Sequence, residues 1–155
     1  MEGIIIGSDH AGFALKETIK PCLVEKGFAV VDAGTHDESP VDYPDIGAAV
    51  ARKVALGEFP RGILICGSGV GMTIVANRFP GVRAALCLDE ETARISRLHN
   101  DSNILVLAGR RTATAGARTI LAVWLQTPFS GERHQGRLDK IRDLETELCR
   151  KLLNY

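Results

Sequence analysis

Two hydrophobic patterns alternate along the chain. Short continuous apolar runs are typical of parallel strands that are buried on both faces. Between them lie longer segments in which apolar residues recur at every third or fourth position, as expected of helices with one buried face. The first such pair is an isoleucine-rich run at 3–7, followed by Leu15, Ile19 and Leu23 on one helical face. Gly27 then occupies the position where glycine commonly ends a helix.

The alternation continues along the chain and predicts five strands and six helices. The strands are expected at 3–7, 29–32, 62–66, 83–88 and 104–107. The helices are expected at 12–26, 45–56, from inside the glycine-rich loop after residue 66 to about residue 79, 90–99, 113–125 and 132–153. Pro21 should kink the first helix, because proline has no backbone N–H and clashes with the preceding turn.

This order of elements predicts an α/β fold with three α/β/α layers, namely a Rossmann-like, doubly wound, five-stranded parallel sheet with an extra C-terminal helix. A chain of 155 residues is long enough for one core, so residues 1–155 are expected to form a single domain. In such a fold the ligand site lies beyond the carboxyl ends of the strands. The last helix carries an apolar stripe that a partner could cover, formed by Leu138, Ile141, Leu144, Leu148 and Leu152.

Composition and charge narrow the possible partners. Hydrophobic residues make up 45% and charged residues 25% of the chain, as in ordinary globular proteins. Nineteen Lys and Arg balance nineteen Asp and Glu, so no global field draws the chain to nucleic acid or to a membrane surface. The longest apolar runs are strand-length, whereas a membrane helix needs about twenty residues. Any anion must therefore be held by a local cluster, and no nucleic-acid or membrane partner is expected.

The four cysteines lack the C-x-x-C spacing of zinc and redox sites, and no secretory signal precedes them, which predicts a cytoplasmic protein. Cys22, Cys87 and Cys149 are expected to be small buried hydrophobic residues, the usual state of a free cysteine. Cys66 differs because it ends the third strand next to a glycine-rich loop. No set of His, Cys, Asp and Glu has metal-ligand spacing, so no metal is expected.

The glycine-rich loop places Gly67, Gly69 and Gly71 at alternate positions between a buried strand and a helix. Its backbone N–H groups would point toward one spot beside the helix N-terminus, which predicts a pocket for an anion or an oxyanion. A tight strand-to-helix turn is the simpler explanation of the glycines taken alone. Met72 stands where a dinucleotide-binding motif needs its third glycine, so no nucleotide cofactor is indicated.

Two groups of chemically active residues are predicted at the same edge of the sheet. The donors of the glycine-rich loop would stabilise the thiolate of Cys66, which favours a role as base or nucleophile. Asp9 and His10 end the first strand, and parallel strands end at one edge. Taken alone, an Asp-His pair is more often a helix cap beside a solvated imidazole.

Two further polar clusters lie later in the chain. His99, Asn100 and Asp101 end the fourth helix, where a histidine favoured by the helix dipole is the simpler explanation. A basic set could grip a phosphate from two sides, although solvated surface arginines are the alternative. Its members are Arg133, His134 and Arg137, within about one helical turn, and Arg110 just beyond the fifth strand.

Five separated motifs resemble those of the ribose-5-phosphate isomerase B family, which also holds the galactose-6-phosphate isomerase subunits and allose-6-phosphate isomerase. The motifs lie at 7–12 (GSDHAG), 42–44 (DYP), 65–71 (ICGSGVG), 96–101 (SRLHND) and 131–137 (GERHQGR). The resemblance spans nearly the whole chain. It implies that the chain interconverts a phosphorylated aldose and ketose without cofactor or metal, with ribose 5-phosphate and ribulose 5-phosphate as the leading pair.

The resemblance also implies a role for each site residue. Cys66 would move a proton between C2 and C1 of the sugar through a cis-enediolate, and His99 would open the furanose ring. Asp9 would hold the sugar hydroxyls. The enediolate would be stabilised by Asn100 and by the loop residues Gly67, Ser68, Gly69, Val70 and Gly71. The phosphate would be bound by His10, Arg110, Arg133 and Arg137.

The resemblance further implies a homodimer, or a dimer of dimers, with active sites at the subunit interface. One chain would supply Cys66, Asp9 and the glycine-rich loop, and the other His99, Asn100 and Arg110. Two alternatives stay open: an isomerase acting on a hexose phosphate such as allose 6-phosphate or galactose 6-phosphate, and a non-catalytic phosphosugar-binding subunit.

Overall fold

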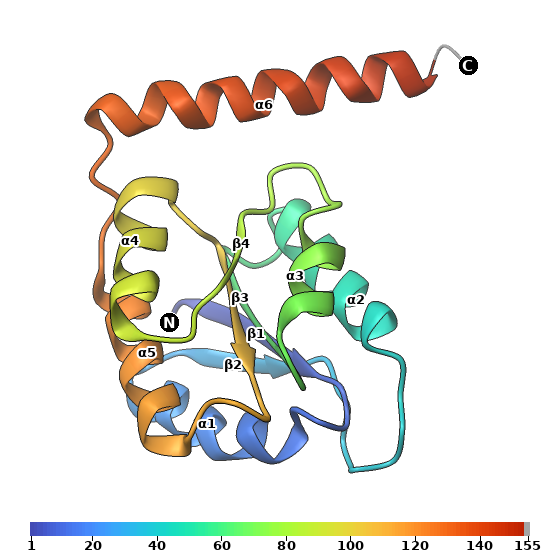
Figure 1. Ribbon diagram of the computed structural model, residues 1–155, viewed down its shortest axis with the longest axis vertical. Helices are drawn as coiled ribbons and strands as arrows, with labels where there is room; N and C mark the ends of the chain where they lie inside the picture. The colour runs from blue at the N-terminus through green and yellow to red at the C-terminus, as the bar shows by residue number, and fades with distance from the viewer. Residues whose placement is uncertain (154–155) are drawn as a thin grey trace.

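The computed structural model describes residues 1–153 and has the predicted α/β architecture (Figure 1). The strands in this part of the chain are β1 (Gly3–Ser8), β2 (Ala29–Asp32), β3 (Arg61–Cys66), β4 (Ala84–Leu86) and β5 (Ile104–Ala108). The helices are α1 (Phe13–Glu25), α2 (Tyr43–Ala55), α3 (Val70–Ala76), α4 (Glu90–Asn100), α5 (Thr114–Gln126) and α6 (Glu132–Leu153). All neighbouring strands are parallel, and their order across the sheet is β2-β1-β3-β5-β4. The predicted five-stranded parallel sheet is confirmed.

Helices cover both faces of the sheet, with α1, α4 and α5 on one face and α2 and α3 on the other (Figure 1). The side chains of β1 show how the two cores form. Ile4 and Ile6 pack in a core that includes Trp124 of α5, whereas Ile5 packs in the opposite core with Val50 of α2. Successive side chains of a strand point to opposite faces, so a strand between two helical layers must be apolar at every position.

Two element boundaries differ from those expected. α2 begins at Tyr43 rather than at residue 45, because Asp42 has the extended backbone of an N-cap and Pro44 suits the first helical turn. β4 covers only three residues of the predicted 83–88. It lies at an edge of the sheet, and the N–H of Arg83 donates to the side-chain oxygen of Asn103 (2.7 Å) rather than continuing the strand.

Two helix ends involve positions that the sequence singled out. α1 continues through Pro21 to Glu25, and Gly27 follows with a φ of 85°, the left-handed conformation expected of glycine after a helix. α3 begins at Val70 inside the glycine-rich loop, as predicted, but ends at Ala76, before residue 79.

A buried ion pair connects α1 to the end of β2. The Nζ of Lys16, which is fully buried, lies 2.6 Å and 2.7 Å from the two carboxylate oxygens of Asp32. Burial alone would raise the pKa of Asp32, but hydrogen bonds from Lys16 and Lys20 and from the N–H of Gly34 hold it below its usual value. The carbonyl of Gly34 in turn accepts the N–H of Ser8 (2.7 Å), so this pair fixes the loop beside the first motif.

α6 stands away from the three layers as an arm across one end of the molecule (Figure 1). Its apolar stripe is open to solvent, since Leu144 is 58% and Leu152 75% exposed. Cys149 of α6 is exposed and Cys22 is half-buried, so the expectation that both are buried is wrong. Cys149 is exposed because α6 leaves the body of the chain, whereas Cys22 lies on α1 at the margin of the core. Neither α6 nor any other helix within residues 1–153 is both long and apolar enough to cross a membrane.

Candidate active site

Cys66 is the last residue of β3, at the carboxyl edge of the sheet. Its side chain is only 4% exposed, and its Sγ accepts a hydrogen bond from the N–H of Gly69 at 3.2 Å. The sulfur of Cys66 therefore lies beside a backbone donor at the head of the glycine-rich loop. The position suits a side chain that exchanges a proton with a molecule bound at this edge of the sheet.

The loop after Cys66 presents a row of backbone donors. Among the residues that the structure describes, no acceptor is found for the N–H of Gly67 or of Ser68. Gly71 lies in the first turn of α3, where N–H groups have no partner within the helix. The N–H of Val70 donates to the hydroxyl of Ser68 (3.3 Å). This arrangement can hold an oxyanion beside the sulfur of Cys66.

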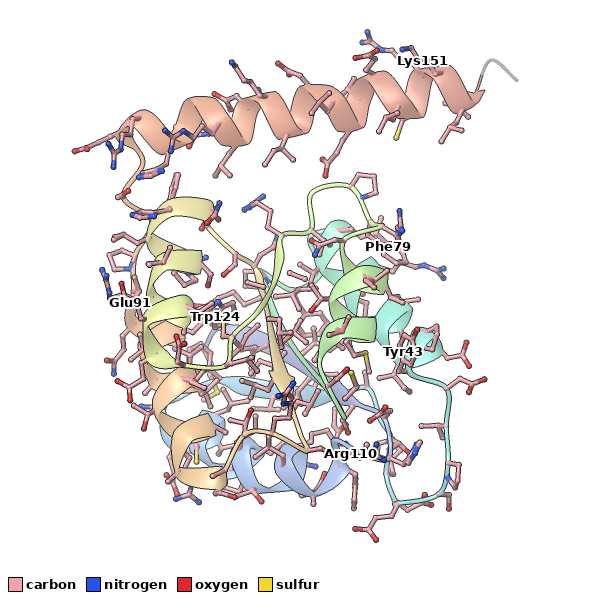
Figure 2. The ribbon with its side chains drawn as sticks, viewed as in Figure 1. Tyr43, Phe79, Glu91, Arg110, Trp124 and Lys151 are labelled. Atoms are coloured by element: carbon pink, nitrogen blue, oxygen red, sulfur yellow. The ribbon has the colours of Figure 1, made fainter. Side chains whose placement is uncertain are left out.

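Two of the loop glycines are required by geometry. Gly69 has a φ of 78°, and a Cβ there would lie 2.3 Å from Cδ1 of Leu86. A Cβ on Gly71 would lie 2.6 Å from Cε2 of Tyr43, because the Tyr43 ring packs directly against this turn. Tyr43 thus covers the loop, and Figure 2 shows it at the start of α2. The 42–44 motif quoted above was the sequence signal for this contact, although it suggested no role.

Asp9 and His10 lie at the same edge as Cys66, as predicted. The N–H of Asp9 donates to the carbonyl of Ile65 (3.1 Å), so the end of β1 lies beside the end of β3. Asp9 is buried, and its Oδ1 accepts the N–H of Gly12 (3.0 Å) before α1 begins, which is a cap-like contact. The Nδ1 of His10 accepts the N–H of Val41 (3.2 Å), which orients the imidazole toward the loop that precedes α2.

Arg110 belongs to the Cys66 edge. Its backbone N–H donates to the carbonyl of Gly67 (3.0 Å), and a Cβ on Gly67 would meet Cδ of Arg110 at 3.4 Å. Figure 2 shows Arg110 at the end of the molecule away from α6. The expectation that Arg110 accompanies His99 is therefore corrected. The physical reason is that Arg110 follows β5, which pairs with β3 in parallel and ends at the same edge.

His99 and Asn100 lie at the other end of the molecule. α4 starts after β4 at the carboxyl side of the sheet and returns toward the amino ends of the strands, finishing beside the start of α6 (Figure 1). α4 has 11 residues and spans about 16 Å, so its last residues lie well away from the carboxyl edge where Cys66 ends β3.

Arg133 and Arg137 are exposed in the first turns of α6, at the His99 end. Asp101, the third residue of the His99 motif, forms ion pairs with Arg83 (2.9 Å) and Arg97 (2.8 Å). Asp101 therefore stabilises the end of α4. The predicted site residues thus form two separate groups. One lies at the carboxyl edge of the sheet, and the other lies at the opposite end of the folded molecule, where α4 ends and α6 begins.

Three residues near the site have surroundings that the sequence did not predict. His134, quoted only as part of the basic set, stacks on His99 with ring centroids 4.3 Å apart. Lys16 gave no signal, because a lysine on a helix predicts a solvated side chain rather than a buried ion pair. The hydroxyl of Ser8 is buried beside Asp9 and has no partner within the described part of the chain.

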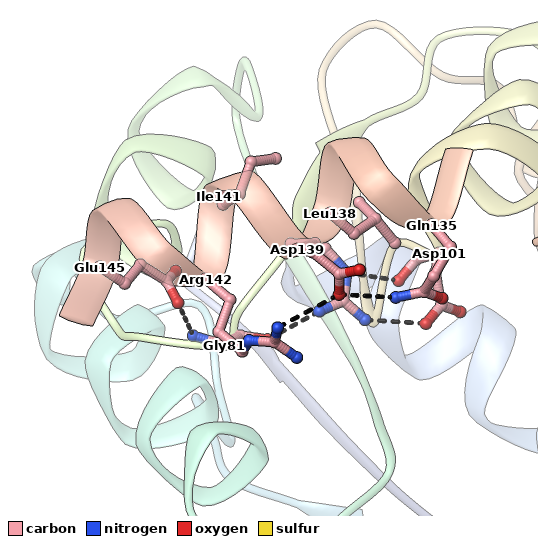
Figure 3. A pocket seen from close by; sticks show the side chains of 9 residues that line it. Gly81, Asp101, Gln135, Leu138, Asp139, Ile141, Arg142 and Glu145 are labelled. Carbon is pink, nitrogen blue, oxygen red and sulfur yellow. Dashed lines mark hydrogen bonds and ion pairs between the residues drawn. The ribbon is translucent and has the colours of Figure 1, made fainter. Parts of the chain in front are cut away.

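A cavity of about 190 Å³ lies under the α6 arm (Figure 3). The carboxylate of Glu145 accepts the N–H of Gly81 across it (3.0 Å), and Leu138 and Ile141 face it from α6. Asp101 of the His99 motif lines this cavity, but none of the predicted catalytic or substrate-binding residues does. The cavity is the space between the arm and the body. Within residues 1–153, no group of three or more His, Cys, Asp and Glu side chains could hold a metal ion.

Comparison with known proteins identifies the relatives of this arrangement. Residues 4–141 match the Ribose/Galactose Isomerase family. The chain belongs to this family. Ribose-5-phosphate isomerase B of Escherichia coli (strain K12) is 44% identical over 145 residues, which are 94% of this chain and 97% of that relative.

Solved structures of relatives have the same fold. Ribose-5-phosphate isomerase B of Clostridium thermocellum superposes with a TM-score of 0.92 at 47% identity, covering 94% of this chain and 99% of that one. The Mycoplasma genitalium protein, solved with bound ribulose-5-phosphate, gives a TM-score of 0.90 at 42% identity, covering 94% and 97%. Membership in the ribose/galactose isomerase family confirms the predicted family and enzyme class, and the superpositions confirm the predicted fold class.

Proposed function

We propose that this member of the ribose/galactose isomerase family interconverts ribose 5-phosphate and ribulose 5-phosphate through a cis-enediolate, without a cofactor. The observation that carries the proposal is the position of Cys66. Its Sγ lies 3.2 Å from the N–H of Gly69, at the head of a loop that presents further backbone donors. The similarity to relatives named ribose-5-phosphate isomerase B supports the choice of sugar.

The chemistry assigned to Cys66 is proton transfer between two neighbouring carbons. Its thiolate removes the proton from C2 of open-chain ribose 5-phosphate, and the resulting thiol returns the proton to C1. The hydroxyl proton of O2 passes to O1 in the same step, so that C2 becomes the carbonyl carbon of ribulose 5-phosphate. Negative charge develops on the sugar oxygens in between. The N–H groups of Gly67 and Ser68 stabilise that charge, and each such donor contributes roughly 3 kcal/mol in enzymes where one was removed.

His99 and the basic residues have roles before and around this step. Ring opening must come first, because only the open chain has an acidic C2 proton. An imidazole can both accept and donate a proton, so His99 is suited to move the proton of the ring oxygen. The phosphate is held by guanidinium groups, which bind it through paired hydrogen bonds, together with His10. The guanidinium groups are those of Arg110, Arg133 and Arg137.

Each active site is built from two copies of the chain. Cys66 and His99 lie at opposite ends of one folded molecule. An isologous dimer can bring the Cys66 end of one copy to the His99 end of the other. Arg110 then stands on the Cys66 side. The apolar stripe of α6, with Leu148 59% exposed, supports a contact between copies, because burying it removes apolar surface from water.

Replacement of Cys66 tests the proposal. We expect Cys66→Ala to lower kcat for ribose 5-phosphate by about 100-fold to 10,000-fold, since a positioned general base contributes that much. Binding of ribose 5-phosphate, measured by calorimetry, should persist. Cys149→Ala is the matched control, because Cys149 is exposed on α6, and its turnover should equal that of the unchanged protein.

Near-normal turnover by Cys66→Ala would contradict the base assignment. If the unchanged protein binds ribose 5-phosphate without turning it over, the chain is a phosphosugar-binding subunit instead. The hexose alternative is retained because the family includes galactose isomerases by its description. Comparing kcat/KM for ribose 5-phosphate with those for allose 6-phosphate and galactose 6-phosphate decides between them.

A further inference from the structure

The imidazole rings of His99 and His134 form a parallel stack. Their centroids are 4.3 Å apart, and the two ring planes differ by 12°. Of the α6 residues that the structure describes, His134 alone is buried, and it is 7% exposed. The most deeply buried residue of α6 thus lies where the start of this helix is fitted against the end of α4.

The chain between α5 and α6 holds this stack in place. The N–H and the hydroxyl of Ser130 both donate to the carbonyl of Leu98, at 3.0 Å and 2.8 Å. Gly131 and Glu132 then adopt φ values of 66° and 44°, so the chain turns sharply before α6. Two hydrogen bonds to the residue before His99 thus fix the turn that precedes α6. This turn places the ring of His134 against the ring of His99.

The surroundings of the stack favour the neutral form of His134. Its pKa is lowered by burial first, and then by the proximity of His99, Arg133 and Arg137, with Glu132 acting weakly in the opposite direction. A neutral aromatic ring attracts a cation over its face, whereas a second cation would repel it. A neutral His134 ring can therefore lie against the His99 ring without charge repulsion.

We propose that His134 is a positioning residue for ring opening, whose ring stacks on His99 and holds that imidazole in the plane needed to reach the ring oxygen of the sugar. This inference rests on the proposed function, because it assigns the ring-opening step to His99. His134 itself transfers no proton in it. Proton transfer depends steeply on position, so an imidazole that rotates out of its plane loses rate even though it remains in the site.

The test compares two reactions of the same enzyme, of which only one needs ring opening. Conversion of ribose 5-phosphate to ribulose 5-phosphate starts from a closed furanose. Exchange of the C1 hydrogen of ribulose 5-phosphate with deuterated water starts from an open chain, because this ketose has its C5 hydroxyl blocked by phosphate. Both rates are followed by nuclear magnetic resonance on one sample.

We expect His134→Ala to slow conversion of ribose 5-phosphate by about tenfold to 100-fold, because a misplaced catalytic group loses rate on that scale. The rate of C1 hydrogen exchange should stay within about twofold of that of the unchanged protein. His134→Phe restores a neutral planar ring and should recover conversion to within about threefold of the unchanged protein. His134→Gln, which is close in size but has no ring, should behave like His134→Ala. The ratio of the two rates does not depend on the fraction of folded enzyme.

Equal loss of both rates in His134→Ala and His134→Gln would overturn the proposal, since His134 would then support the whole site. Unchanged conversion in either variant, or a His134→Phe variant as slow as His134→Ala, would also overturn it. Failure of the proposed function gives a different result, because the unchanged protein would then catalyse neither conversion nor exchange.

Discussion

At the scale of single residues, the surroundings give the cysteines different chemistry. Cys66 ends a strand, and its Sγ accepts a hydrogen bond from the N–H of Gly69. The sequence predicted this position because a buried strand runs directly into glycines. Burial raises the pKa of Cys87 to about 11, with a small further contribution from Asp89 and an opposing hydrogen bond from Ser96. Cys149 was misjudged, because whether a helical stripe is covered depends on contacts far away in the chain.

These surroundings predict the order of thiol alkylation. With iodoacetamide at a pH of about 8, Cys149 should be modified first, because it is exposed, whereas Cys87 should stay unmodified until the protein unfolds. Peptide mass spectrometry over a time course measures both rates. Cys149→Ser should remove the fast phase, and modification of Cys87 in the folded protein at the rate of Cys149 would contradict the prediction.

At the scale of elements, the start of α3 depends on one glycine. Gly69→Ala places a side chain in the left-handed region, which costs about 1–2 kcal/mol, and its Cβ would lie 2.3 Å from Leu86. We expect a loss of at least about 1 kcal/mol in the free energy of unfolding. Turnover of ribose 5-phosphate should also fall, because Gly69 orients the N–H that reaches Cys66.

The matched control for Gly69→Ala is Gly116→Ala in α5. A Cβ there meets no atom within 4 Å, and alanine favours a helix by about 0.5–1 kcal/mol. The control should be as stable as the unchanged protein or slightly more stable in urea unfolding, with equal turnover. If both variants had the same unfolding midpoint, the left-handed conformation of Gly69 would not limit stability.

The elements themselves were largely predictable, and their edges and pairing were not. Apolar runs located each strand because both faces of the sheet are covered. The apolar run at 83–88 predicted a longer strand than β4, because the N–H of Arg83 donates to the side chain of Asn103 at the edge of the sheet. The strand order, in which β5 lies between β3 and β4, depends on contacts that no local pattern encodes.

At the scale of the whole molecule, the general rules of the fold explain which parts of the site were predictable. Parallel strands end at one edge, which places Asp9 beside Cys66, and the same rule places Arg110 there rather than with His99. The His99–His134 stack could not be predicted, because it depends on how the turn before α6 is tied to α4. The two groups of site residues lie at opposite ends of the folded chain, which is why the proposed active site takes one group from each of two copies.

The separation of the two halves leads to a test of the shared site. Cys66→Ala and His99→Asn proteins, each nearly inactive, are mixed in equal amounts, unfolded and refolded together. Random pairing makes about half of the dimers mixed. If Cys66 and His99 meet across the interface, each mixed dimer has one site with both substitutions and one site with neither, so about a quarter of the unchanged activity returns.

If both residues instead acted within one chain, every site in every dimer would keep one substitution and no activity would return. Native mass spectrometry of the refolded sample verifies that mixed dimers are present, so an inactive mixture with mixed dimers would refute the shared site. A mixture of Cys66→Ala with Arg110→Ala is the matched control. Arg110 lies on the Cys66 side of the chain, against Gly67, so these two substitutions fall in different sites of a mixed dimer and activity should not recover.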